Sequence, residues 1–159
     1  MKLLINKLIL ISFCLLSLFS FAQINKYKCL MQITNYQGEA AYVVVSLINP
    51  KGNYEKTLHI FGSDKKWYNT LKNWDKAIKS QKNNFNGITG ASISGGKRTL
   101  ITISLDDSLL NKGYKIRFES AVENKNYYSS EVEIPLNVPE MTERIEGKGY
   151  IRFVKLSKF

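Results

Sequence analysis

Apolar and polar residues alternate along much of this 159-residue chain. Ile101, Ile103 and Leu105, for example, are separated by Thr102 and Ser104. A period of two places successive side chains on opposite faces of a β-strand, so one face of each strand is expected in a core. The same alternation recurs at residues 114–118 and 132–136, and β-branched and aromatic residues dominate four other segments. The pattern predicts seven strands, at residues 28–34, 40–48, 54–61, 101–105, 114–118, 132–136 and 149–156.

Turn-forming residues separate the first three of these strands. Residues 36–39 read Tyr-Gln-Gly-Glu and predict a hairpin turn, and residues 49–53 read Asn-Pro-Lys-Gly-Asn and predict a second turn. Seven short strands within about 130 residues favour two packed sheets. The expected fold class is therefore mainly β, an antiparallel immunoglobulin-like β-sandwich.

One segment, residues 64–81, departs from the β pattern. Asp64 can cap the N-terminus of a helix. Four apolar residues follow it at helical spacing and form one stripe: Trp67, Leu71, Trp74 and Ile78. Lysines occupy the other faces. The spacing predicts one inserted amphipathic helix of about four turns, whose tryptophans cover an open end or edge of the sandwich; stacking of the tryptophans on a bound ligand is the alternative.

The first 22 residues have the order of a secretory signal peptide. Lys2 and Lys7 supply its positive end, residues 8–21 its apolar run, and Ala22 the small residue at the cleavage site. The run is shorter than the about 20 apolar residues that cross a bilayer, and no later stretch approaches that length. We therefore expect an exported protein, periplasmic, extracellular or peripheral at the envelope, with one β-sandwich domain at residues 23–159 and no transmembrane segment after cleavage.

Removal of the signal peptide leaves a strongly basic chain. Two of the 23 lysines and arginines and none of the 13 acidic residues are lost, so the mature chain has a net charge of +8. Such a charge favours encounters with acidic partners. The lysines are scattered rather than clustered, however, so a solubilising surface is the simpler interpretation, and no nucleic-acid partner is predicted. One cysteine, Cys29, remains, which excludes an internal disulfide and favours a small buried apolar residue.

Residues for hydrolytic or metal chemistry are scarce. A catalytic triad needs a histidine oriented by an acid, and a zinc site needs several histidines or cysteines. His59 is the only histidine, and we expect it to be a half-exposed residue of a strand. Asp106–Asp107 predicts a turn opening toward Ser108, while Glu119 and Glu123 have no evident partner. We therefore expect no catalytic residue and no metal site, and an electron carrier or a binding protein rather than a stand-alone enzyme.

A segment rich in glycine and hydroxyl residues, residues 86–98, precedes the strand at 101–105. A flexible connecting loop is its simplest interpretation. Its Thr89-Gly90-Ala91-Ser92, with Asn86 before it, also resembles the motif that exported FMN transferases modify. In that motif Asp is usual at the position of Asn86, and Thr is commoner at the position of Ser92. The resemblance implies that the Ser92 hydroxyl carries FMN through a phosphoester bond.

The residue types of this segment suit that modification. A hydroxyl that must reach the diphosphate of FAD inside another protein needs small neighbours and an adaptable loop. Backbone amides near Gly95–Gly96 and two cationic side chains are expected to stabilise the attached phosphate. The predicted cofactor-binding residues are Ser92, Thr89, Gly90, Ala91, Asn86, Lys97 and Arg98.

A second resemblance extends over most of the mature chain. It is carried by residues Met31–Thr34, Ala41–Leu47, Trp67-Tyr68, Ile88–Ser92, Tyr114–Glu119 and Gly147–Arg152. These segments are similar to a family of predicted periplasmic proteins of unknown function, DUF2271. The resemblance implies an association with PepSY-type membrane proteins and FMN transferases, in flavin-dependent electron transfer or iron uptake.

Two hypotheses for the function follow. In the first, an exported sandwich with covalent FMN on Ser92 passes electrons between a PepSY-type membrane reductase and an external acceptor, and an FMN transferase attaches the flavin. In the second, the chain is a non-catalytic binding or assembly module, whose loops or exposed edge strand recognise a partner at the cell envelope. The second hypothesis needs no cofactor.

Overall fold

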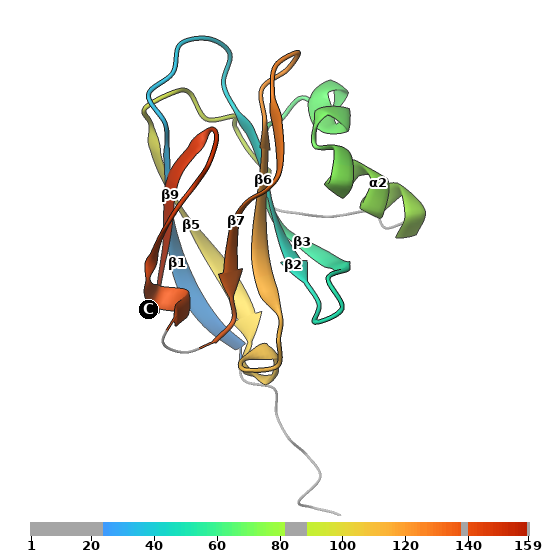
Figure 1. Cartoon of the computed structure of the whole chain (residues 1–159), viewed down its shortest axis with the longest axis vertical. Helices are drawn as coiled ribbons and strands as arrows, with labels where there is room; N and C mark the ends of the chain where they lie inside the picture. The colour runs from blue at the N-terminus through green and yellow to red at the C-terminus, as the bar shows by residue number, and fades with distance from the viewer. Residues whose placement is uncertain (1–23, 82–88, 138–139, 159) are drawn as a thin grey trace, which may run out of the picture.

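A computed structural model describes residues 24–81, 89–137 and 140–158 (Figure 1). The predicted signal peptide lies outside these ranges, so it and the domain boundary after it stay predictions. The described residues form nine strands, β1 Ile24–Ile33, β2 Tyr42–Ile48, β3 Tyr54–Phe61, β4 Thr89–Gly90, β5 Arg98–Asp106, β6 Lys115–Ala121, β7 Tyr127–Pro135, β8 Arg144–Glu146 and β9 Ile151–Lys158. They also form the helix α2, Lys72–Gln81, and three short 3-10 helices, η1 Lys65–Thr70, η2 Asp107–Leu109 and η3 Glu140–Thr142.

The strands form two sheets that face each other. One sheet has the order β5-β1-β9-β8, and the other has the order β4-β3-β2-β6-β7. All pairings are antiparallel except that between β3 and β4, which is parallel. The prediction of a mainly β sandwich is confirmed. The strands β4 and β5 follow each other in the chain and lie at the edges of different sheets.

The core lies between the two sheets. Cys29 of β1, opposite Ile101 and Leu156 in the neighbouring strands, packs there with Val43 and Val45 of β2. The alternation seen in the sequence places these side chains inward. All seven residues of β2 are buried, including Val44, which faces the opposite way into a second apolar cluster. The unbroken apolar run of β2 is typical of a strand covered on both faces.

The helical segment covers that outer face of β2. The prediction of one inserted amphipathic helix at about residues 64–81 is confirmed by α2, but the helix is shorter than predicted, because η1 ends at Thr70 and α2 begins at Lys72. Leu71 between them has φ −83° and ψ 67°, outside the helical region, and is fully buried. The Asp64 side chain caps η1 by accepting from the Lys66 N–H at 3.0 Å, as its position suggested.

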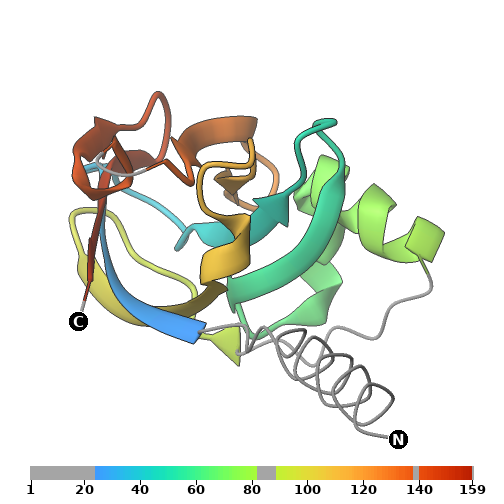
Figure 2. The ribbon, with the colours of Figure 1, turned by 90° about the horizontal axis from the view of Figure 1, so that it is seen from below.

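The apolar stripe of this segment packs against the five-stranded sheet rather than against an open end of the sandwich. Leu71 and Trp74 are buried there with Tyr42, Val44 and Ile60, and four aromatic or aliphatic side chains pack around them: Tyr54, Trp67, Ile78 and Tyr127. Figure 2 shows α2 on the side of this sheet that faces away from β1 and β9. Burial of the stripe, and not helix propensity, therefore holds the segment in place.

Candidate functional site

The predicted flavin-binding loop joins the two sheets. It leaves β4, which is one edge of the five-stranded sheet, and enters β5, which is one edge of the four-stranded sheet. Ile93 holds the loop in place, because its N–H and carbonyl bond to the Ala41 carbonyl and N–H at 2.9 and 2.8 Å. The Ile93 side chain is also buried. Ser92 is therefore positioned by the backbone and side chain of the residue that follows it.

A hollow of about 480 Å³ opens beside this loop, between the edges of the two sheets. It is lined by His59, Phe61, Gly90, Ala91, Ser92, Ile93, Ser94, Lys97, Arg98, Thr99 and Ile101. Its volume lies within the range of about 300–1,000 Å³ that is usual for small-molecule sites. Five of the predicted residues thus meet in one place. Thr89 is exposed and does not line the hollow, and Asn86 lies outside the described residues.

Some of the polar groups near the opening of the hollow already form hydrogen bonds within the protein, and others are exposed. The Ser92 hydroxyl is half-buried, and Lys97 is exposed. Arg98 Nε donates to Gln32 Oε1 at 2.9 Å, which leaves the other guanidinium N–H groups. The Gly96 N–H donates to the Thr34 carbonyl at 2.9 Å. The Gly96 N–H is therefore already used within the fold, and phosphate binding by the other groups near Gly95–Gly96, Lys97 and Arg98 stays a prediction.

Gly95 fixes the path of the loop after Ser92. A Cβ at this position would lie 2.1 Å from the carbonyl oxygen of Tyr36, a backbone atom that has little freedom to move. The loop thus touches the connection between β1 and β2 so closely that only glycine fits. Together with the Ile93 bonds, this contact gives residues 92–95 a defined path.

His59 forms part of the floor of the hollow. The sequence predicted a half-exposed residue, and this is wrong, because His59 is only 5% exposed. Its ring lies against Phe61 with centroids 4.3 Å apart, and its Nε2 has no hydrogen-bond partner among the described residues. Burial lowers the pKa of the imidazole below its usual value, which favours the neutral ring. The spacing of two between His59 and the inward-facing Phe61 was the signal that could have revealed this placement.

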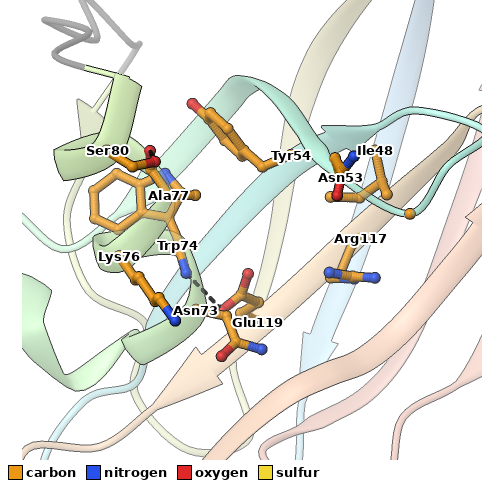
Figure 3. Close-up of a pocket in the computed structure, with 11 residues that line it drawn as sticks. Ile48, Asn53, Tyr54, Asn73, Trp74, Lys76, Ala77, Ser80, Arg117 and Glu119 are labelled. Carbon is orange, nitrogen blue, oxygen red and sulfur yellow. Dashed lines mark hydrogen bonds between the residues drawn. The ribbon is translucent and has the colours of Figure 1, made fainter.

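A second cavity, of about 330 Å³, lies between α2 and the outer face of the five-stranded sheet (Figure 3). Glu119 of β6 lines this cavity and is 2% exposed. Its Oε2 accepts hydrogen bonds from the Tyr127 hydroxyl at 2.6 Å and from the Trp74 N–H at 3.3 Å. The Asn73 N–H in turn donates to the Tyr127 hydroxyl at 2.9 Å.

Two of these bonds cap the N-terminus of α2 with side chains from the sheet, and the third joins the two capping side chains to each other. The first N–H groups of a helix lack partners within the helix, and here Glu119 and Tyr127 supply them. Burial raises the pKa of Glu119 above its usual value, an effect that its hydrogen bonds oppose. Sequence reasoning missed this role, since it left Glu119 at a strand end without a partner. No local pattern links Glu119 to Trp74, because they are 45 residues apart.

The part of the chain that the structure describes contains no cluster of three or more His, Cys, Asp or Glu residues that could hold a metal ion. Within the same ranges, no helix is long and apolar enough to cross a membrane.

Comparison with known proteins gives one match. A family model described as predicted periplasmic protein (DUF2271) matches residues 24–153, which includes all nine described strands apart from the last residues of β9. No curated protein and no solved structure matches the chain.

Proposed function

The chain belongs to the DUF2271 family of predicted periplasmic proteins, and from this premise we propose that it is an exported carrier of covalent FMN, attached to Ser92, that transfers electrons. One observation carries the proposal. Gly90, Ala91 and Ser92 line the same hollow as Lys97 and Arg98, so three of the motif residues, two cations and a space for a ligand occur together.

The residues present fit the group. The Ser92 side chain lines the hollow and is only partly buried, so a transferase could reach its hydroxyl. Lys97 and Arg98 bring positive charge to the mouth of the hollow, where a phosphate on Ser92 would lie. Apolar side chains, among them Phe61 and Ile101, form walls against which a flat ring system would pack. When bound, FMN supplies one- or two-electron transfer, and the protein holds the flavin and tunes it.

The attachment step balances with FAD as the co-substrate. Ser92 Oγ attacks the phosphorus on the FMN side of the diphosphate, a new P–O bond to serine forms, and the bridging P–O bond breaks. AMP leaves, and the hydroxyl proton passes to a base of the FMN transferase or to water. Gly90 and Ala91 on the approach to Ser92 minimise steric conflict with the transferase. In this scheme a PepSY-type membrane reductase exchanges electrons with the attached flavin.

Intact-mass measurement tests the proposal. The full-length chain is co-expressed with an exported FMN transferase, and the mature protein is recovered from the periplasm. We expect the mass of one FMN ester, visible flavin absorption, and loss of both in Ser92→Ala. Ser94→Ala is the matched control, since Ser94 is an exposed hydroxyl that lines the same hollow, and it should retain the adduct. An unmodified wild-type mass, or an adduct that persists in Ser92→Ala, refutes the assignment.

The alternative function is a non-catalytic binding or assembly module at the envelope. The observation that favours it is the outer face of the four-stranded sheet, where Leu100 is 60% exposed. Four exposed cations belong to the strands of this sheet, and the register of β1, β5 and β9 places Lys28, Arg98 and Lys155 nearer to Leu100 than Lys26, which pairs with Ser104. A colourless protein that co-purifies with a membrane partner, and loses it in the variant Lys28→Glu/Lys155→Glu, would establish this function. Retention of the partner by that variant would reject the face as the binding surface.

A further inference from the structure

His59 is the one buried polar side chain among the residues that line the hollow beside Ser92. Buried polar atoms in folded proteins nearly always have a hydrogen-bond partner. His59 Nε2 has none among the described residues, and only one other side-chain atom in those ranges, Ser46 Oγ, shares this condition. Ser46 does not line the hollow. An unsatisfied group at the floor of a ligand-sized space therefore needs an explanation that is specific to this space.

The position of His59 brings it close to the proposed attachment point. Its Nε2 lies under Gly90, 3.3 Å from where a Cβ of that residue would stand. No side chain at position 90 separates the imidazole from the loop. Ser92 follows two residues later, and two residues of chain span at most about 7 Å. A group esterified to Ser92 and carried on a flexible ribityl chain is therefore within reach of the floor.

The chemistry of the ring also matches. A neutral imidazole carries one N–H donor and one acceptor nitrogen. The polar edge of an isoalloxazine presents carbonyl oxygens and ring nitrogens as acceptors and one N–H as a donor. The remaining side chains near the floor, Phe61, Ile93 and Ile101, offer apolar contact only. A flavin in the hollow would thus find apolar walls and a single buried hydrogen-bonding group.

We infer that His59 is the hydrogen-bonding contact for the isoalloxazine of FMN held on Ser92, and so a positioning residue that tunes the flavin. This inference rests on the proposed function, because it needs a flavin in the hollow. It goes beyond that function by naming the residue that orients the ring. Occupation of the hollow would supply the partner that the imidazole otherwise lacks.

The single histidine makes a direct test feasible. The mature protein is prepared without a histidine tag and with ¹⁵N-labelled histidine, so its imidazole signals report on His59 alone. Spectra are compared between the unmodified protein, the same protein with added free FMN, and the FMN ester formed by the transferase. We expect the imidazole signals to move on esterification and on addition of FMN. These measurements use the wild-type chain, so they do not depend on whether a His59 variant folds.

Variants then separate hydrogen bonding from shape. His59→Phe keeps a flat ring and removes both nitrogens, and His59→Gln restores a donor and an acceptor. We expect the ester in both variants, with a changed flavin absorption and reduction potential in His59→Phe and partial recovery in His59→Gln. Free FMN should bind His59→Phe about fivefold to tenfold more weakly than wild type. Thr102→Ala, on the exposed outer face of β5, is the control and should leave all of these unchanged.

The outcomes distinguish the inference from the proposed function. An ester with unmoved imidazole signals and an unchanged potential in His59→Phe refutes the role of His59 and leaves the Ser92 assignment intact. Absence of the ester in wild type refutes the assignment. In that case free FMN decides the inference: imidazole signals that shift with saturable FMN binding support a flavin contact, and signals that stay in place reject it.

Discussion

Replacing Glu119 by alanine is expected to detach the start of α2 from the five-stranded sheet. The carboxylate accepts from the Tyr127 hydroxyl at 2.6 Å and from the Trp74 N–H at 3.3 Å, and it is 2% exposed. Glutamine keeps one oxygen in place to accept both bonds, whereas alanine leaves both donors without their acceptor. The glutamine variant is therefore the matched control, since it removes the charge and retains the acceptor.

The magnitude follows from the groups left unsatisfied. A buried donor without a partner costs about 1–3 kcal/mol, and the Tyr127 hydroxyl keeps one of its bonds, to the Asn73 N–H. We expect Glu119→Ala to be about 3 kcal/mol less stable than Glu119→Gln, which is about 10 °C in Tm for a domain of this size. Equilibrium unfolding followed by tryptophan fluorescence is the assay, because the only two tryptophans, Trp67 and Trp74, lie in this cluster.

The pH dependence gives an independent check with a defined sign. Burial raises the pKa of Glu119 above its unfolded value of about 4.5, so the folded state binds the proton more tightly. The stability that this contributes is fully present below the unfolded pKa and is lost as the pH rises through the folded pKa. The stability advantage of wild type over Glu119→Gln should therefore shrink as the pH rises from about 4.5. Equal stabilities of the alanine and glutamine variants, or an advantage that grows with pH, would refute the reasoning.

Two further predictions concern Gly95 and Cys29. Gly95→Ala should lower the free energy of unfolding by about 3 kcal/mol through overpacking, because the new Cβ would lie 2.1 Å from the Tyr36 carbonyl oxygen. The control Gly52→Ala, with open space around it and φ +82°, should lower it by only about 1 kcal/mol. Equal losses for the two variants in denaturant unfolding would contradict this prediction. Burial raises the pKa of the Cys29 thiol to about 12 and leaves the residue 1% exposed, so a disulfide reagent at pH 8 should modify native protein at least about 50-fold more slowly than unfolded protein. Fast labelling of the native chain would show the thiol to be accessible.

The strands were predictable because their signal is local. Ile103 and Leu105 are inward and buried, as their alternation with Thr102 and Ser104 required. The buried state of Cys29 was also predicted correctly. The apolar stripe that contains Leu71 and Trp74 did pack as a unit, but its break at Leu71 was missed, since helical spacing continues across that residue. The position of this stripe, against the outer face of the five-stranded sheet, was missed as well. The continuous apolar run of β2 was a sign that both faces of that strand are covered.

The candidate site was predictable in part. Gly90, Ala91 and Ser92 are neighbours in sequence, and Lys97 and Arg98 follow closely, so their meeting at one loop required no knowledge of topology. The hydrogen bond from the Gly96 N–H to the Thr34 carbonyl could not be predicted from the sequence. Thr34 follows the first strand, and it meets the loop only because the two sheets pack together.

The sequence by itself determined seven of the nine described strands, which of their faces are apolar, that one segment is amphipathic and that one loop carries a hydroxyl among glycines, whereas the short strands β4 and β8 were missed. These properties depend on residues within a few positions of one another. Only the tertiary structure decided that His59 lies beneath Gly90 and that Glu119 caps α2. Such contacts depend on strand order and register. A period of two determines which face of a strand is buried, but it does not determine which strands lie next to it.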